Sequence, residues 1–182
     1  MFDTICAIAT PLSAGSIGIV RISGEKSFEI IEKIFNKPVI PEKINHGWII
    51  DDVTGKKLDE VIVLPFKNPK SYTGEDIVEI QSHGSPVVIK EILNLVLKNG
   101  AKPAQRGEFT KRAFLNHKID LPQAEAVLDL INAKTSKSAL LAANNLSGTL
   151  KKEIDIIREK IIEILAKITA SLDFPEDVKE VE

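Results

Sequence analysis

The sequence feature that most constrains the fold is a helix-start signal at Asp120, directly after a polar segment at residues 116–118. Asp120 can accept hydrogen bonds from the free backbone amides of a first helical turn, and Gln123 can bond back to it as the partner in a capping box. Pro122 suits the same turn because its missing N–H would have no partner there. We therefore predict a helix from residue 121 and a domain boundary at the polar segment.

The two sides of this boundary differ in charge. Residues 1–118 carry 16 Lys and Arg against 14 Asp and Glu, a net charge of +2, whereas residues 119–182 carry 8 against 12, a net charge of −4. At 182 residues the chain has room for one ordinary domain and an appendage. We expect a first domain over residues 1–118 and the first part of a helical domain over residues 119–182.

Residues 1–118 alternate between β-branched runs and amphipathic segments. Apolar runs bounded by turn residues predict five strands, over residues 5–9, 17–22, 46–50, 61–66 and 77–81. Apolar residues at helical spacing predict helices over residues 28–35, 86–97 and 109–115. Lys111 and Arg112 are expected to face outward from the last of these helices. The order of elements is typical of an α+β layer, a mostly antiparallel sheet with helices on one face.

The composition of the whole chain excludes several classes of protein. The net charge of −2 is too small to indicate nucleic-acid binding by bulk electrostatics, and the single Cys6 excludes an internal disulfide framework. No apolar run reaches the roughly 18 residues of a membrane span. His46, His83 and His117 are too scattered to indicate a metal site, so no metal is expected. We expect a soluble, cytoplasmic chain that does not associate with a membrane.

Two glycine-containing segments resemble ligand-binding loops only in part. Residues 15–18 match the GxxG loop of some RNA-binding domains, but that loop joins two helices and this one precedes a strand. A hairpin turn that needs a positive φ is the commoner explanation. Residues 24–27 resemble a phosphate loop, but Glu25 lies where a glycine should precede Lys26, and its carboxylate would repel phosphate. We predict no nucleotide site there.

Three charged residues lie where a purely structural role does not require them. Arg21 lies near the end of an apolar strand, Glu79 interrupts another, and Lys118 lies in the polar segment before the second domain. An ionised group in a strand often lies on the solvated face of a sheet, and that explanation suffices for any one of the three alone. By themselves these residues do not define a site.

Four stretches taken together resemble a known family. They are DTICAIATP at residues 3–11, GIVRISG at 18–24, SYTGED with EIQSHG over 71–84, and GEFTKRAFLNHKIDLPQAEA at 107–126. In this order and spacing they resemble the N-terminal part of the tRNA-modification GTPases of the MnmE (TrmE) family, over essentially the whole chain. The resemblance implies a folate-binding, aminomethyltransferase-like fold that forms a homodimer, followed by a helical domain into which a GTPase domain is inserted.

The resemblance also implies a cofactor and partners. Family members bind a tetrahydrofolate, as the 5-formyl or methylene derivative, and with the FAD protein MnmG they modify the wobble uridine of tRNA. By this resemblance Arg21, Glu79 and Lys118 are the folate contacts. A carboxylate such as Glu79 can accept the paired N–H donors of a pterin, while Arg21 or Lys118 can meet the carboxylates of the folate tail or polar groups of the ring. Whether Arg21 or Lys118 meets the folate tail stays open, and no catalytic residue is identified.

The family's GTP, Mg²⁺ and K⁺ sites have no counterpart here, because residues 1–182 contain neither a phosphate loop nor the family's C-terminal cysteine motif. We therefore expect no GTP hydrolysis by this chain alone, and either a fragment or a nucleotide domain beyond residue 182. The main alternative is a free-standing folate-dependent transferase of the aminomethyltransferase type, with Asp76 or His83 as the acid or base. A plain RNA-binding scaffold is disfavoured by the charge balance and the few aromatic residues.

The C-terminal segment carries a nearly heptad-spaced apolar seam with a second apolar stripe beside it. The members of the seam are Leu150, Ile154, Ile157, Ile161, Ile164, Ile168 and Leu172. We predict that this helix packs on segments outside residues 1–182 or on another chain, and that it associates or frays alone. It is expected to end at residues 173–175, because the residue before a proline disfavours helical geometry.

Overall fold

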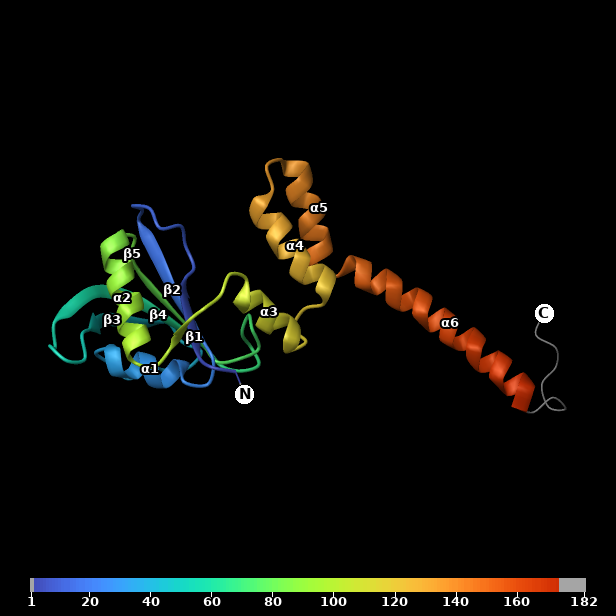
Figure 1. Cartoon of the computed structure of the whole chain (residues 1–182), viewed down its shortest axis with the longest axis horizontal. Helices are drawn as coiled ribbons and strands as arrows, with labels where there is room; N and C mark the ends of the chain where they lie inside the picture. The colour runs from blue at the N-terminus through green and yellow to red at the C-terminus, as the bar shows by residue number, and fades with distance from the viewer. Residues whose placement is uncertain (1, 174–182) are drawn as a thin grey trace. The chain divides into compact units, whose positions relative to one another are not determined.

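The computed structural model describes residues 2–173, and the chain divides into two compact units, Met1–Lys118 and Ile119–Glu182 (Figure 1). The described part of the first unit contains six strands and three helices. The elements are β1 (Ile5–Ile8), β2 (Ile17–Ser23), α1 (Ser27–Ile34), β3 (Asn45–Ile50), β4 (Lys57–Phe66), β5 (Ile77–His83), α2 (Pro86–Lys98), β6 (Lys102–Pro103) and α3 (Glu108–Leu115). The second unit contains α4 (Leu121–Asn132), α5 (Ser136–Leu146) and α6 (Thr149–Asp173).

The strands form one sheet in the order β3-β4-β5-β2-β1-β6. Every pairing is antiparallel except that of β1 with the two-residue β6. The predicted α+β architecture is confirmed. The sequence pattern does not predict β6, because two residues cannot show an alternation. It also starts β4 too late, at residue 61, because residues 57–60 are mostly polar although they still pair with β3.

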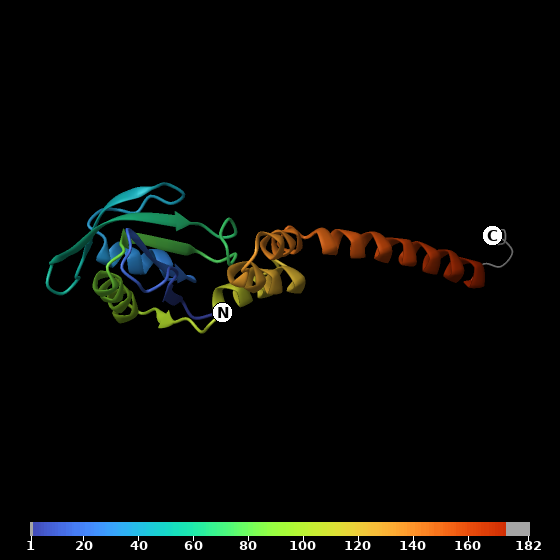
Figure 2. The same ribbon diagram turned by 90° about the horizontal axis from the view of Figure 1, so that it is seen from above.

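Two helices of this unit, α1 and α2, lie on the same side of the sheet (Figure 2). Val20 and Ile22 of β2 are fully buried in the core that these helices form with the sheet, as is Ile80 of β5. Successive side chains of a strand point to opposite faces. The side chains of Arg21 and Glu79 therefore belong to the other face, which neither helix covers, and we call it the open face.

Position 18 requires a glycine because of close packing and not because of a turn. Within residues 2–173 the glycines with positive φ do not include Gly15 or Gly18, so the expectation of a hairpin turn with positive φ is wrong. A Cβ on Gly18 would lie 2.6 Å from Cγ1 of Ile89 and would collide with its Cδ1. Ile89 is buried in the core, so β2 and α2 approach closely only because residue 18 has no side chain.

The second unit begins as the sequence predicts. Asp120 Oδ1 accepts from the Gln123 amide at 2.9 Å, and Gln123 Oε1 accepts from the Asp120 amide at 2.9 Å, which confirms the capping box at the start of α4. Thr135 and Ser138 form a second capping box at the start of α5. The helices α4 and α5 pack against each other, and Ala126 of α4 is buried.

The helix α6 has no buried residue. Ile157 and Ile161 of the predicted seam, for example, are 58% and 60% exposed. The prediction that this surface packs on another segment or chain stays a prediction. The helix reaches Asp173, the last described residue, so the predicted stop at residues 173–175 lies mostly outside the described part. No helix within residues 2–173 is both long enough and apolar enough to cross a membrane.

Candidate functional site

An ion pair lies on the open face of the sheet. Arg21 and Glu79 are directly opposite each other in the antiparallel pairing of β2 with β5. Arg21 Nε donates to Glu79 Oε1 at 2.8 Å, and Arg21 Nη2 lies 2.7 Å from the same oxygen. The two side chains are 27% and 16% exposed, so the pair is partly shielded and still open to solvent. The fold thus brings together two of the three predicted contact residues.

Two aromatic rings lie beside the Arg21 guanidinium. The ring centroids of Tyr72 and Phe109 are each 5.5 Å from Arg21 Cζ, which is within the range of a cation–π interaction. Tyr72 belongs to the loop of residues 67–76, which joins β4 to β5, and Phe109 belongs to the first turn of α3. Tyr72 Oη and Thr110 Oγ1 form a hydrogen bond of 2.9 Å, so the loop and the helix are joined close to the guanidinium.

Lys118 contacts the 67–76 loop rather than the ion pair. Lys118 Nζ donates to the carbonyl oxygen of Pro69 at 2.9 Å. The Lys118 side chain also packs so close to Gly74 that a Cβ there would lie 3.1 Å from its Cγ. Within residues 2–173 no hydrogen bond or ion pair joins Lys118 to Arg21 or Glu79. The structure therefore places the side chain of the third predicted residue against the loop that carries Tyr72.

Arg112 of α3 was missed by the sequence reasoning. It is only 3% exposed, so the expectation that it faces outward is wrong, whereas Lys111 does face solvent. Arg112 Nη1 lies 3.1 and 3.2 Å from the two carboxylate oxygens of Glu75, and Nη2 donates to Glu108 Oε1 at 2.9 Å. Glu108, four residues earlier on the helix, is the one local signal for this burial. Glu75 is 37 positions away, and no local pattern predicts that contact.

The charge of Glu108 is stabilised by its neighbours. Burial alone would raise the pKa of Glu108, but hydrogen bonds from the Gln105 amide and from Arg112 favour the ionised form, as do the charges of Arg112 and Lys111. Together these interactions hold the pKa of Glu108 below its usual range. The carboxylate that receives Arg112 on α3 is therefore ionised at neutral pH.

The residues around Arg21 fit a flat heterocycle that carries N–H donors. Both contacts from Arg21 use Oε1 of Glu79, and no hydrogen bond within residues 2–173 engages Oε2. A reduced pterin presents paired N–H donors to a carboxylate and a flat ring to aromatic side chains. Glu79 offers the acceptor, and Tyr72 and Phe109 offer the ring faces. Among the described residues no group of three or more His, Cys, Asp or Glu side chains could hold a metal ion.

Asp76 and His83, the candidate acids or bases of a transferase, are engaged away from the ion pair. Asp76 Oδ2 lies 2.6 Å from Lys67 Nζ, and Asp76 Oδ1 accepts from the amide of residue 68 at 2.9 Å. His83 Nδ1 lies 2.8 Å from Asp59 Oδ1. His83 also stands four positions beyond Glu79 on β5, about 13 Å along an extended strand. Neither residue adjoins the Arg21–Glu79 pair.

The chain matches known proteins over both of its units. Residues 4–118 match the family model of the GTP-binding protein TrmE N-terminus, and residues 121–182 match that of the MnmE helical domain. The chain is 49% identical over 179 residues to a tRNA modification GTPase MnmE from Thermotoga petrophila, which corresponds to 97% of this chain and 39% of that protein. It is 51% identical over 185 residues to proteins of the same name from Acetivibrio thermocellus and Streptococcus pneumoniae, which corresponds to 98% of this chain and 40% of each relative. The chain thus spans about two-fifths of the length of these relatives. It belongs to the TrmE (MnmE) family of tRNA modification GTPases.

Proposed function

We propose that this chain is the folate-binding and dimerising module of a tRNA-modifying GTPase, followed by the first helices of its helical domain. The observation that supports the proposal best is the Arg21–Glu79 pair on the open face, with Tyr72 and Phe109 beside it. A tetrahydrofolate derivative, in the 5-formyl or methylene form, matches the chemistry of this group. Lys118 is the third proposed contact, supported by its hydrogen bond to Pro69 of the loop that carries Tyr72.

The proposed roles follow from charge and hydrogen-bond capacity. Glu79 accepts the paired N–H donors of the pterin, as carboxylates do in bidentate pairs with guanidinium groups. Arg21 keeps the Glu79 carboxylate paired, which matters because a partly buried charge without a partner is costly. Either Arg21 or Lys118 meets the carboxylates of the folate tail.

We also propose that a second copy of the chain covers the open face. On this face Ile17 and Ile62 are 61% and 38% exposed, whereas the opposite face is covered by α1 and α2. A cavity of about 290 Å³ opens among residues that include Ile17, Ile62 and Gln81. Gln81 is the next residue after Glu79 on the same face of β5. Association of two copies would therefore bury apolar surface on the same face of the sheet as the ion pair.

The remaining properties are proposed for the whole protein to which this chain corresponds. They are GTP hydrolysis with Mg²⁺ and K⁺ outside residues 1–182, cooperation with an FAD protein of the MnmG type, and modification of tRNA in the cytoplasm. Support comes from about 50% identity to proteins named tRNA modification GTPase. A free-standing transferase is less well supported, because Asp76 and His83 are engaged away from the ion pair.

Isothermal titration of the 182-residue chain with 5-formyl-tetrahydrofolate tests the folate proposal. We expect wild-type protein to bind, and Glu79→Ala to bind more than about tenfold more weakly, since a hydrogen bond to a charged group contributes about 1.5–3 kcal/mol. The circular dichroism of the variant should match that of the wild type. Glu91→Ala removes an exposed carboxylate of α2 and is the matched control, with unchanged affinity expected. Equal affinities for Glu79→Ala and wild type would refute the role of Glu79. A parallel titration with tRNA alone should show no binding, in contrast to an RNA-binding scaffold.

A further inference from the structure

We propose that Arg112 is a positioning residue of the folate site, which holds the 67–76 loop and α3 in the arrangement that places Tyr72 and Phe109 beside Arg21. This inference rests on the proposed function. Within residues 2–173 Arg112 has no recorded contact with Arg21 or Glu79, so its effect on the site must pass through other residues. Its partners are Glu75 of the loop and Glu108 of α3.

Each partner of Arg112 lies next to one of the two rings in the sequence. Glu108 directly precedes Phe109, and Glu75 follows Tyr72 by three positions in the same short loop. Arg112 Nη1 contacts both oxygens of Glu75 while Nη2 contacts Glu108, so one guanidinium joins the two segments. A displacement of either carboxylate would move the adjacent ring relative to the Arg21 guanidinium.

The network also reaches the strand that carries Arg21. Ser23 Oγ donates to Glu75 Oε2 at 2.7 Å and lies 2.8 Å from Thr73 Oγ1. Ser23 is buried and stands two positions after Arg21 on β2. The loop is thus held from two sides, by Arg112 of α3 and by Ser23 of β2. Two further hydrogen bonds, Tyr72 Oη with Thr110 Oγ1 and Asn116 Nδ2 to the Thr73 carbonyl oxygen, join only the loop and the α3 region.

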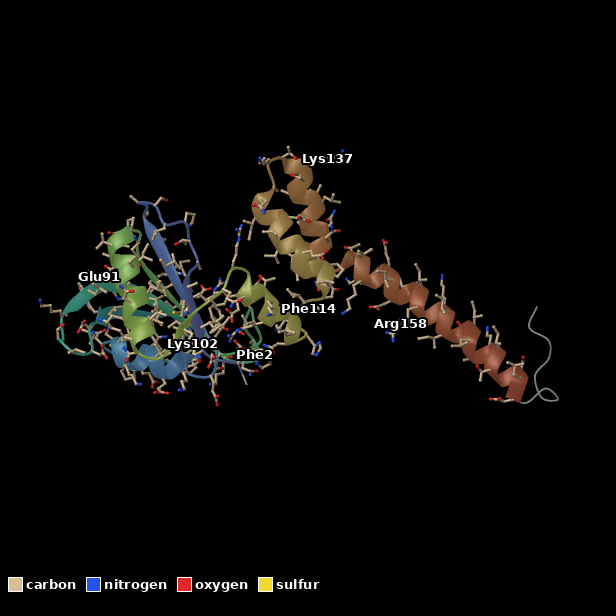
Figure 3. All side chains as sticks on the ribbon, in the orientation of Figure 1. Phe2, Glu91, Lys102, Phe114, Lys137 and Arg158 are labelled. Atoms are coloured by element: carbon tan, nitrogen blue, oxygen red, sulfur yellow. The ribbon has the colours of Figure 1, made fainter. Side chains whose placement is uncertain are left out.

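Stability alone is a poor explanation for this arginine. Its Nε is buried and has no hydrogen-bond partner among the described residues, and the guanidinium otherwise lies 5.3 Å from the ring centroid of Phe2. Phe2 is labelled in Figure 3 near the start of the chain. Buried ion pairs are often no more stabilising than apolar side chains of similar size, and an unpaired buried donor is costly. What an apolar residue could not supply is a planar group that bridges two separate carboxylates.

The chain offers a direct spectroscopic probe of this arrangement. Tyr72 is its only tyrosine, so labelling with 3-fluorotyrosine gives one ¹⁹F resonance that reports on the 67–76 loop beside Arg21. The first variant, Arg112→Met, removes the charge and the planar guanidinium group. The second, Arg112→Lys, keeps the charge but cannot bridge both carboxylates in the same way. Lys111→Met, an exposed cation on the same helix, is the matched control. Ile31→Val, a core substitution in α1, controls for a general loss of stability.

We expect the Tyr72 resonance of the free protein to shift or broaden in Arg112→Met and Arg112→Lys but not in either control. We expect the affinity for 5-formyl-tetrahydrofolate to fall at least about tenfold in Arg112→Met, and less in Arg112→Lys, which retains one of the two carboxylate contacts. If Arg112→Met does not fold, Arg112→Lys alone decides the question. An unchanged Tyr72 resonance in a folded Arg112 variant would overturn the proposal, as would wild-type folate affinity in that variant. If the wild-type chain binds no folate but the Tyr72 resonance still moves in the Arg112 variants, the proposed function fails while the link between Arg112 and the loop stands.

Discussion

Arg21 directs two nitrogens, Nε and Nη2, to a single oxygen of Glu79, across neighbouring antiparallel strands. This leaves the second carboxylate oxygen for another donor and keeps the charge of Glu79 balanced. The coupling free energy of the pair can be measured without any ligand, because two partly shielded charges in contact should stabilise each other.

A double-mutant cycle of Arg21→Met and Glu79→Gln should give a coupling free energy of about 1 kcal/mol in the free energy of unfolding, at the upper end for partly exposed ion pairs. Chemical denaturation of the four proteins measures it. The solvent-exposed pair Lys33–Glu29 on α1 is the control cycle, and a clearly weaker coupling is expected there because solvent screens the two charges. Strictly additive effects of the Arg21 and Glu79 substitutions would contradict the interaction.

Gly18→Ala should lower the free energy of unfolding by about 1–3 kcal/mol, the usual cost of overpacking a core. The new Cβ would meet the buried side chain of Ile89, which has little room to move. Thermal or chemical denaturation measures the loss. The double variant Gly18→Ala/Ile89→Val removes the colliding Cδ1 atom and should recover part of it. If Gly18→Ala is as stable as wild type, β2 and α2 do not pack closely enough at residue 18 to exclude a Cβ atom.

Asp120→Ala should destabilise the start of α4 by about 1 kcal/mol, because the first-turn amide of Gln123 loses its side-chain acceptor. Hydrogen exchange of the backbone amides of residues 121, 123 and 124 measures the effect locally. Asp120→Asn retains an acceptor and should behave nearly as wild type. Glu125→Ala, an exposed substitution in the same helix, is the control. Equal exchange rates in Asp120→Ala and Glu125→Ala would exclude a contribution from the capping box.

Glu108→Gln should reduce stability at neutral pH but not in acid. The pKa of Glu108 in the folded protein lies below its unfolded value of about 4.3, so its charge stabilises the fold above that pH. This stabilisation is lost as the pH falls through the folded pKa. The difference in Tm between wild type and Glu108→Gln should therefore be constant above about pH 5.5 and shrink below about pH 4.3. Glu91→Gln, an exposed carboxylate of α2, should show no such trend. A difference that persists unchanged to pH 3 would rule out the ionised Glu108 as its source.

Local sequence patterns predicted most of the fold correctly, because they record interactions between residues that are close in the chain. The capping box of Asp120 and Gln123 spans only three positions, and both of its hydrogen bonds form as expected. The alternation in β2 likewise separates the buried Val20 and Ile22 from the side chain of Arg21. Strands were missed or begun too late where the pattern was short or polar, as in β6 and the first residues of β4.

The candidate site was predicted only in part. Arg21, Glu79 and Lys118 were joined by resemblance to a family, since no local pattern connects residues so far apart. Helical periodicity assigned Arg112 to the outer surface, because a charged residue in an amphipathic helix normally faces solvent. Its burial depends on its contact with Glu75 of the 67–76 loop, which is 37 positions away in the sequence.

By itself, the sequence determined the boundary after residue 118, the sheet with its two covering helices, and the family, because each of these depends on periodicity, caps and motifs read along the chain. Only the tertiary structure decided that Arg21 pairs with Glu79, that Lys118 contacts the Tyr72 loop, and that Arg112 is buried. The physical reason is that hydrogen bonds and ion pairs act over about 3 Å in space. Residues within that distance can lie anywhere in the sequence, and only the completed sheet and loop bring them together.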